Sequence, residues 1–279
     1  MRTKFITKKE YAKILLNIAK KGERVNDRVP VRFIKSMKEN QGVINLFSPY
    51  NETEDGLERK NPVVVALGDS VTAGHFEFTI DINELFKKDK LEGEMNFSTD
   101  IEITDARECY LEKFRNMLID KYEKTSVSVI NSGIAGDNLY GMQKRLNRDV
   151  IRYQPDLILF NGSLNWSEEC GGNEEYRNIL LNMVRKMKAE TTADIIIMTP
   201  NMEIAGPFTN PNSKLDDRVE IIREVADMEG ICIADTYLIW EEYVSKGYSL
   251  KELLSNGFNH PSTVGHEVYA ITLMKLLEE

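Results

Sequence analysis

Five short runs of apolar residues recur along the chain, at residues 63–67, 127–130, 157–160, 195–198 and 231–234. The runs are rich in Val, Ile and Leu, and each leads within two residues to Gly, Asn, Asp or Pro. Apolar residues at consecutive rather than alternate positions are typical of a strand buried on both faces. The pattern therefore predicts a parallel sheet of five strands that is covered by helices on both sides.

The segments between the runs carry apolar residues at helical spacing. Between the first two runs, apolar side chains over residues 110–122 share one helical face, and Asp105 and Glu108 have the spacing of a capping box. Further helical patterns cover residues 139–151, 176–187, 219–228 and 264–277. This alternation of strands and helices predicts an α/β fold, a doubly wound three-layer sandwich.

Two segments depart from the alternation, and the first is residues 1–60. A capping box and one apolar face predict a short helix over residues 7–22, and strand pieces are expected at residues 29–33 and 43–47. We interpret residues 1–60 as an N-terminal extension packed on one larger domain over residues 61–279, not as a second domain.

The second segment is the connection over residues 75–104, which is much longer than a usual βα loop. Alternating apolar and polar residues over 76–82 predict an added strand. Loops of this length are usually functional lids, interaction elements or disordered. A homo-oligomer is left open, formed through the insertion at 76–104 or through the N-terminal extension.

Composition narrows the class of protein. Of the 279 residues, 42% are hydrophobic and 29% are charged, which excludes a disordered or fibrous chain. The net charge of −9 argues against a nucleic acid or an anionic membrane as the partner. No apolar run approaches the length of a membrane span and the N-terminal residues lack the pattern of a secretory signal, so a soluble cytoplasmic protein is expected. Three widely spaced cysteines exclude a disulfide framework and a cysteine-based zinc site.

The first apolar run leads directly into Gly68 and Ser70. A serine at the carboxyl end of a strand lies at the edge of an open α/β sheet, where ligands bind. Gly68 permits a tight turn, and a following helix would direct its amide N–H groups toward the serine oxygen. The alternative is that Ser70 is an ordinary helix N-cap.

A serine nucleophile needs a base within hydrogen-bond distance, and the chain has three histidines. His260 precedes a proline in a loop before the last helix, and it is the best candidate. His266 begins that helix, where packing or capping is its expected role. His75 follows Ser70 closely at the start of the long connection and is a candidate substrate contact.

Acyl transfer also requires donors to a developing oxyanion. The second and third runs are followed by the segments 131–138 and 161–166, and each segment contains Gly and Asn. Each alone is an ordinary turn, because Gly and Asn are the commonest turn formers. Since both follow neighbouring strands of one sheet, their N–H groups could converge beside Ser70.

Gly68-Asp69-Ser70, Gly136, Asn165 and His260 match, in order, the four sequence blocks of the SGNH (GDSL) hydrolase superfamily. The chain resembles this superfamily over roughly residues 62–279. The resemblance implies a flavodoxin-like sheet, ester or thioester hydrolysis, and neither a metal nor another cofactor. It also implies that Ser70 is the nucleophile and one oxyanion donor, that Gly136 and Asn165 supply the other donors, and that His260 is the base.

Three positions depart from the family pattern. In the third block, Ser163 stands where Gly is expected and Trp166 stands where Asp is usual. Gly257 stands where the Asp that orients the histidine is expected. The orienting carboxylate is therefore missing from its usual place. Asn256, a backbone carbonyl and an acid from a distant loop are the candidates to orient His260.

The substrate is expected to be a small-molecule or oligosaccharide ester. Polar and amphipathic residues at the predicted rim favour a short acyl group on a sugar, because sugars are bound by hydrogen-bonding side chains and aromatic faces. Asp69, His75 and Trp166 are the candidate substrate contacts, and the sequence around His260 resembles a subgroup of sugar acetyl esterases. The alternatives are a hydrolase of the lysophospholipase or thioesterase type, and a catalytically weak relative that binds a glycan or a protein.

Overall fold

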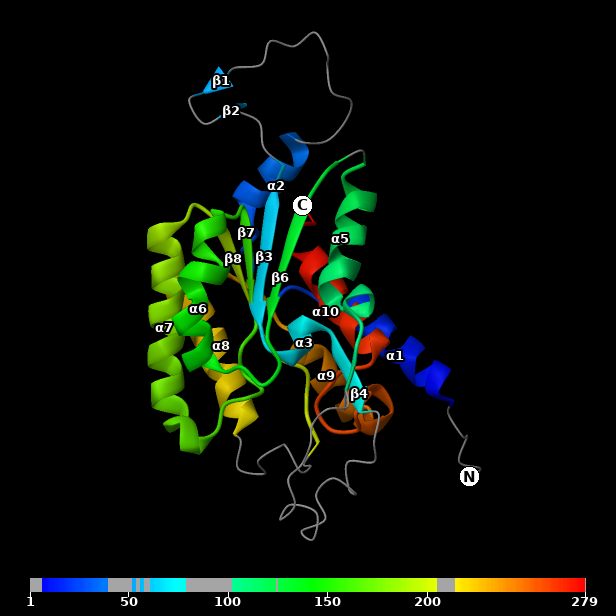
Figure 1. Ribbon diagram of the computed structural model, residues 1–279. Coiled ribbons are helices and arrows are strands. Elements are labelled where there is room, and N and C mark those ends of the chain that lie inside the picture. Colours follow the sequence, from blue (N-terminus) through cyan, green and yellow to red (C-terminus); the bar gives the residue numbers. More distant parts are fainter. Residues whose placement is uncertain are drawn as a thin grey trace, which may run out of the picture.

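The computed structural model describes residues 7–39, 52–53, 56–57, 61–78, 102–123, 125–204 and 214–278. Within these residues, five parallel strands form the central sheet, in the order β6-β3-β7-β8-β9 (Figure 1). They are β3 (Val63–Gly68), β6 (Ser128–Gly133), β7 (Leu157–Phe160), β8 (Asp194–Met198) and β9 (Cys232–Ala234). All five apolar runs fall on these strands, so the predicted α/β fold with a flavodoxin-like sheet is confirmed.

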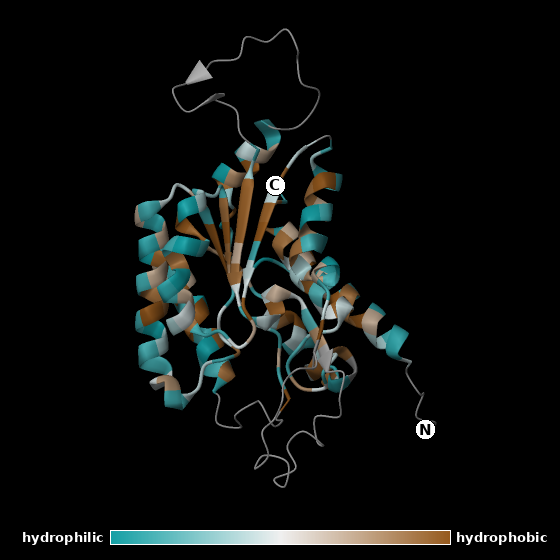
Figure 2. Cartoon of the chain, viewed as in Figure 1, coloured by the Kyte–Doolittle hydropathy of each residue, from teal (hydrophilic) through white to brown (hydrophobic). Residues whose placement is uncertain are grey.

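The continuous apolarity of the strands follows from two cores, one on each face of the sheet. In β3, Val64 and Ala66 belong to one core, and Val65 and Leu67 belong to the other. Because successive side chains point to opposite faces and both faces are covered, no position on the strand is left for a polar residue. Figure 2 shows the strands as the most hydrophobic elements of the chain.

Helices cover both faces of the sheet (Figure 1). One face carries α6 (Leu139–Asp149), α7 (Gly172–Glu190) and α8 (Leu215–Glu229), whose buried side chains share a core with Val65. The other face carries α5 (Tyr110–Lys121) and α10 (Thr263–Lys275), whose buried side chains share a core with Val64.

The helix predicted over 7–22 is α1 (Lys8–Lys21), and it begins with the capping box of Thr7 and Glu10. Its Leu15 packs in a third apolar cluster with Trp240 of α9 (Thr236–Ser245) and Val268 of α10. Figure 1 shows α1 on the side of α10 that faces away from the sheet.

The strand piece expected at 29–33 is wrong, because this segment enters α2 (Val31–Glu39). Pro30 accepts the first hydrogen bond of that helix, from the N–H of Ile34 at 2.9 Å, and a helix start does not need the N–H that proline lacks. Phe33 and Met37 then share the buried face. The strand piece expected at 43–47 lies outside the described residues.

The long connection starts with β4 (His75–Phe78), which pairs antiparallel with β5 (Glu102–Thr104) at its other end. The predicted added strand is therefore confirmed over residues 76–78, and its remainder, like the rest of the insertion at 79–101, lies outside the described residues. The short elements are β1 (Glu52–Thr53), β2 (Gly56–Leu57), α3 (Ser70–Ala73), and the 3₁₀ helices η2 (Ala106–Glu108), η3 (Ile151–Tyr153), η4 (Glu168–Cys170) and η5 (Leu250–Leu253). Across the part of the chain described, no helix is both long and apolar enough to cross a bilayer.

Candidate active site

The predicted site residues come from the carboxyl ends of neighbouring strands. Ser70 follows β3, Gly136 follows β6, and Asn165 follows β7. β3 lies between β6 and β7 in the sheet. After β3 the chain continues to β6 on one side of β3, and after β6 it crosses to β7 on the other side. Ligands of open α/β sheets bind at such a switch point, outside the carboxyl ends of the strands.

A tight turn presents Ser70 at this edge. A Cβ atom at Gly68 would lie 2.0 Å from Oγ1 of Thr72, so only glycine lets α3 fold back against its own strand. The side chain of Asp69 accepts a hydrogen bond from the N–H of Val71 at 3.0 Å and caps the helix. Gly74 then ends α3 with a φ of 89°, in the left-handed region.

The hydroxyl of Ser70 and the imidazole of His260 form a hydrogen bond. Nε2 of His260 lies 3.0 Å from Oγ of Ser70, although the two residues are 190 positions apart in the sequence. The exposed fractions are 7% for Ser70 and 5% for His260. The structure thus brings the predicted nucleophile and base together in a site that is mostly screened from water.

The other nitrogen of the imidazole contacts the backbone. Nδ1 of His260 lies 3.0 Å from the carbonyl oxygen of Phe76, on β4. A carbonyl can only accept, so Nδ1 carries the proton, and Nε2 is left to accept a proton from Ser70. This is the tautomer that a general base requires.

The expectation that Asn256 orients the imidazole is wrong. Its Oδ1 accepts hydrogen bonds from the backbone N–H groups of Phe258, Asn259 and His260, at 3.2, 3.0 and 2.9 Å. Asn256 therefore holds the backbone of the histidine loop, and the ring is oriented by Phe76. The short polar side chain of Asn is suited to such local backbone contacts.

Gly257 occupies the position where the family pattern places the orienting Asp. Its φ is 82°, in the left-handed region that favours glycine, and its N–H donates to the carbonyl of Leu254 at 3.2 Å. Within the part of the chain that the structure describes, no atom lies within 4 Å of where a Cβ at this position would be. The missing carboxylate is thus accompanied by a backbone conformation that disfavours any side chain.

Gly136 lies in the loop between β6 and α6. Its φ is 72°, and a Cβ there would meet no atom of the described residues within 4 Å. The loop returns to the nucleophile strand, because the N–H of Ile134 donates to the carbonyl of Gly68 at 3.1 Å. The side chain of Asn138 then caps α6. These contacts hold the backbone of Gly136 at the edge of the sheet from which Ser70 projects.

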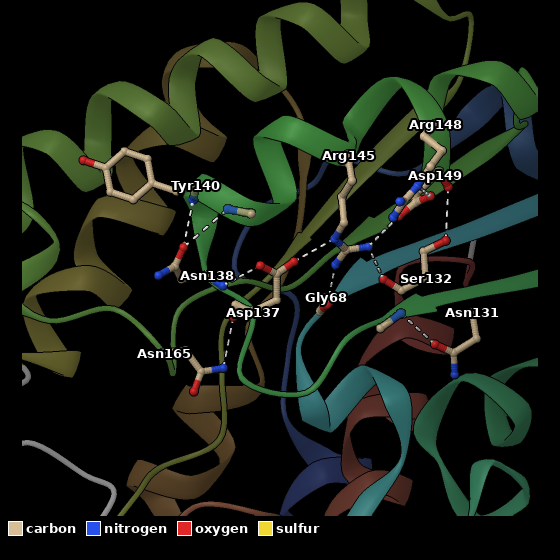
Figure 3. Close-up of polar contacts among 12 residues, drawn as sticks. Gly68, Asn131, Ser132, Asp137, Asn138, Tyr140, Arg145, Arg148, Asp149 and Asn165 are labelled. Atoms are coloured by element: carbon tan, nitrogen blue, oxygen red, sulfur yellow. Dashed lines mark hydrogen bonds and ion pairs between the residues drawn. The ribbon is translucent and has the colours of Figure 1, made fainter.

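The side chain of Asn165 is fixed against this same loop. Its Nδ2 atom donates to the carbonyl of Asp137 at 3.0 Å (Figure 3). An amide nitrogen has two N–H donors, so the second can be directed to a ligand. The contact links the two segments that were expected to supply oxyanion donors.

Two of the candidate substrate contacts are buried. The exposed fraction of Trp166 is 2%; its Nε1 donates to the carbonyl of Gly172 at 2.9 Å, and its ring packs between Tyr140 and Tyr176. Asp69 is fully buried beneath the serine turn. The expectation that these side chains contact the substrate is therefore wrong, because an aromatic or acidic residue beside a site residue can serve the core instead.

The other two histidines have different surroundings. His75 is half-buried on β4, with its ring centroid 6.2 Å from that of His260, so it stays a candidate substrate contact. His266 is fully buried, and its Nδ1 accepts a hydrogen bond from the N–H of Tyr110 at 3.2 Å. Burial lowers the pKa of His266 to about 3, so this ring stays neutral at ordinary pH.

Burial also changes the titration of Asp69. The loss of water around its carboxyl raises the pKa of Asp69 to about 7, and the hydrogen bond from the N–H of Val71 acts in the opposite direction. In the described part of the chain, no group of three or more His, Cys, Asp or Glu side chains could hold a metal ion.

A backbone carbonyl was among the candidates to orient His260, but the sequence did not indicate which carbonyl, nor the role of Asp137. Every residue has a backbone carbonyl, whatever its side chain, so nothing in the sequence could identify the carbonyl of Phe76 as the acceptor. Asp137 is different, because its carboxylate accepts from Arg145 at 2.7 Å. Asp137 precedes Arg145 by eight positions, and Arg145 lies in the short polar helix α6. This spacing was only a weak signal for an ion pair between the two residues.

Comparisons with known proteins identify the family of this chain. The GDSL-like Lipase/Acylhydrolase family matches residues 66–268, which include every strand of the central sheet except the start of β3. The chain belongs to this family. It is therefore an acylhydrolase, an enzyme that hydrolyses carboxylic esters.

Individual relatives are distant. An acetylxylan esterase of Geobacillus stearothermophilus is 25% identical over 165 residues, which cover 55% of this chain and 74% of the relative. The solved structure of the acetylxylan esterase Axe2 of this organism has a TM-score of 0.56 at 21% identity and covers 78% of this chain and 94% of its own. LAE5, an α/β hydrolase enzyme from the metagenome of Lake Arreo, Spain, has a TM-score of 0.58 at 20% identity, with 78% and 97% covered. At such identities the solved structures establish the fold that the chains share.

Proposed function

We propose that this enzyme hydrolyses short acyl esters, above all acetyl esters, of carbohydrates through a serine nucleophile and a histidine base. The observation that carries the mechanism is the 3.0 Å contact between Oγ of Ser70 and Nε2 of His260, in a site where Nδ1 of the same ring meets a backbone acceptor. A serine hydroxyl becomes an effective nucleophile when an adjacent base removes its proton as the bond forms.

In the first step Oγ of Ser70 attacks the ester carbonyl while His260 takes the hydroxyl proton. The C–O bond to the alcohol breaks, the imidazolium returns the proton to the leaving alcohol, and an acyl-enzyme forms. Water then enters. It gives a proton to His260 as it attacks the acyl carbon. The bond from the acyl carbon to Oγ then breaks, the imidazolium returns the proton to Oγ, and the carboxylic acid is released with Ser70 and His260 restored.

Each tetrahedral intermediate carries a negative oxygen, and three groups are proposed to bind it. They are the backbone N–H groups of Ser70 and Gly136 and the second N–H of the Asn165 amide. The contact of Asn165 with the carbonyl of Asp137 supports this role, because it fixes the amide before the substrate arrives. Donors that are oriented in advance need no reorganisation when the charge develops.

A sugar ester as the substrate is supported by the relative whose name is acetylxylan esterase and by the surroundings of the site. Asn138 and Asn165 are polar, and Tyr140 is an exposed aromatic residue in the first turn of α6. Polar side chains and an exposed aromatic face are the usual means of binding a sugar, whereas a long acyl chain needs an extended apolar groove.

The experiment is a rate series with nitrophenyl acetate, butyrate, octanoate and palmitate, followed by acetylated xylo-oligosaccharides, for the parent enzyme and for Ser70→Ala. We expect rates to fall with chain length, acetate to be released from the oligosaccharides, and Ser70→Ala to be inactive on all of them. Faster hydrolysis of octanoate than of acetate would favour a lysophospholipase or thioesterase activity. Binding of the oligosaccharides without turnover of any ester would favour a glycan-binding relative.

A further inference from the structure

Arg145 on α6 is a buried arginine at the edge of the site. Its side chain is 7% exposed, and its guanidinium donates to four oxygen acceptors (Figure 3). Nε donates to Oδ2 of Asp137 at 2.7 Å, and Nη2 donates to the carbonyl of Gly68 at 2.9 Å. Nη1 donates to the carbonyl of Ser132 at 2.7 Å and to Oδ2 of Asp149 at 3.1 Å.

These acceptors belong to the segments that carry the site. Gly68 is the last residue of β3, two positions before Ser70, and Ser132 lies at the end of β6. Asp137 directly follows Gly136, and its carbonyl accepts the amide of Asn165. One planar guanidinium thus joins the backbone before the nucleophile to the loop that carries Gly136 and accepts the hydrogen bond of Asn165.

We propose that Arg145 is a positioning residue that sets the oxyanion donors of Gly136 and Asn165 relative to Ser70 by tying Asp137 to the backbone of Gly68 and Ser132. The inference rests on the proposed function, because it concerns the geometry of the same oxyanion site. Arg145 itself does not touch the substrate. Its effect passes through Asp137, so it should change turnover and leave substrate binding nearly unchanged.

The shape of the guanidinium matters to this role. Arginine presents five N–H donors in a rigid plane, whereas lysine offers one compact ammonium group. A lysine at position 145 keeps the positive charge opposite Asp137, but it cannot also reach the carbonyls of Gly68 and Ser132. Arg145→Lys therefore separates the geometry of the contact from its charge.

The packing at Gly141 provides a second way to perturb the contact between Arg145 and Asp137. A Cβ at Gly141 would lie 1.7 Å from Oδ1 of Asp137, so the carboxylate occupies the space that glycine leaves free. Alanine is a better helix former than glycine, which favours the fold of α6 in Gly141→Ala. This substitution displaces Asp137 and keeps the Arg145 side chain, so it tests the proposal without removal of a buried charge.

Arg148 is the matched control. It lies one turn further along α6, and its Nε and Nη2 donate to Asp149, the acid that Arg145 also contacts, at 2.6 and 2.8 Å. Its side chain is 63% exposed, and among the described residues its hydrogen bonds go to neither Asp137 nor Gly68. Arg148→Met removes an arginine from the same ion-pair group and leaves the proposed positioning contacts in place.

The experiment measures kcat and KM on nitrophenyl acetate for the parent and for Arg145→Lys, Gly141→Ala and Arg148→Met. We expect kcat to fall by about 10- to 100-fold in the first two variants, with KM within about 2-fold of the parent, because a displacement of about 1 Å can cost this much. Arg148→Met should keep the kcat of the parent. Parental kcat in both Arg145→Lys and Gly141→Ala would overturn the proposal.

A double-mutant cycle with Asn165→Ala identifies the route of the effect. If Arg145 acts through the oxyanion donors, Arg145→Lys should lower kcat far less in the Asn165→Ala background than in the parent. The same fold-loss in both backgrounds would mean that Arg145 acts elsewhere, and the proposal would be wrong.

Hydrogen exchange gives a readout that does not depend on activity. The amides of residues 133–138 should exchange faster in Arg145→Lys than in the parent or in Arg148→Met, and unchanged exchange would overturn the proposal.

Ser70→Ala, assayed in parallel, distinguishes a failure of the proposed function from a failure of the role proposed for Arg145. If Ser70→Ala keeps the parental rate, the proposed function fails and this inference fails with it. If Ser70→Ala is inactive while the Arg145 and Gly141 variants stay fully active, only this inference fails.

Discussion

Nδ1 of His260 lies 3.0 Å from the carbonyl oxygen of Phe76, a residue 184 positions earlier in the chain. The carbonyl belongs to β4, which begins the long connection after the serine turn. The segment that looks like an insertion in the sequence thus contributes an atom to the environment of the proposed base. A neutral acceptor fixes the tautomer of the ring, but it stabilises an imidazolium less than a carboxylate does.

The first prediction concerns the nucleophile and the base. Ser70→Ala and His260→Ala should each remove nearly all esterase activity, and the double mutant should lose little more, because the two groups act as one unit. Steady-state kinetics on nitrophenyl acetate measure this. Labelling of a different serine by a serine-directed phosphonate in the intact protein would show that the assignment is wrong.

The second prediction concerns Asn165. Asn165→Ala should lower kcat by about 10²- to 10³-fold with little change in KM, which is typical of the loss of one oxyanion donor. The contact with the carbonyl of Asp137 at 3.0 Å is also lost, so the thermal midpoint of the variant serves as a control for folding. An unchanged kcat with a raised KM would indicate that Asn165 binds the substrate in its ground state.

The third prediction concerns Asp235, an acid that could be mistaken for a missing triad member. Its Oδ1 accepts from Oγ1 of Thr199 at 2.9 Å, and its Oδ2 accepts from Nε of Arg223 at 2.7 Å. Asp235→Asn should therefore destabilise the fold by about 1–3 kcal/mol, the usual cost of disrupting a buried hydrogen-bonded group.

The kcat of Asp235→Asn should stay within about 2-fold of the parent at a temperature where both are folded, since its carboxylate serves the fold. Denaturant unfolding and steady-state kinetics test the two parts. A loss of kcat equal to that of His260→Ala, in a variant with parental stability, would mean that Asp235 belongs to the catalytic group.

The fourth prediction concerns pH and Asp69. Its pKa is 3.8 in an unfolded chain and is raised to about 7 in the folded protein by burial. Between these values the folded state holds a proton that the unfolded state has released, so the contribution of Asp69 to stability falls as the pH rises from about 4 to about 7. A shift of this size corresponds to roughly 4 kcal/mol.

Asp69→Asn keeps a side-chain oxygen to cap Val71 and removes the titration. The free energy of unfolding of the variant minus that of the parent should therefore grow from pH 4 to pH 8. Denaturant titrations at both values measure this difference, and titrating groups that do not interact with Asp69 cancel between the two proteins. A difference that stays constant over this range would contradict the raised pKa of Asp69.

The sheet could be predicted because each of its strands repeats the same pattern of consecutive apolar residues. Val64 and Val65 of β3 face different cores, so both kinds of position on the strand are apolar. The other strands of the sheet also lie between the two cores. The segment at 29–33 could not be assigned in this way, because β-branched residues around Pro30 resemble a strand until the helical face of Phe33 and Met37 is taken into account.

The candidate site was predictable only where a residue type carries the chemistry. Ser70 and His260 are reactive types in an ordered set of motifs, and the structure brings them within hydrogen-bond distance. The predictions for Trp166 and Asn256 are wrong, because sequence position does not tell whether a side chain points to the active site, to the core or to its own backbone. The carbonyl of Phe76 belongs to the backbone and has no counterpart in the sequence pattern.

The left-handed turn at Gly257 has a consequence for any variant that would introduce the usual acid. An Asp introduced there would have to adopt a φ of 82°, at a cost of about 1–2 kcal/mol, and its Cβ would have no neighbour within 4 Å among the described residues. One substitution at this position thus carries a cost in stability, and no described neighbour of the new Cβ offsets it. A change in the shape of the turn would remove that cost.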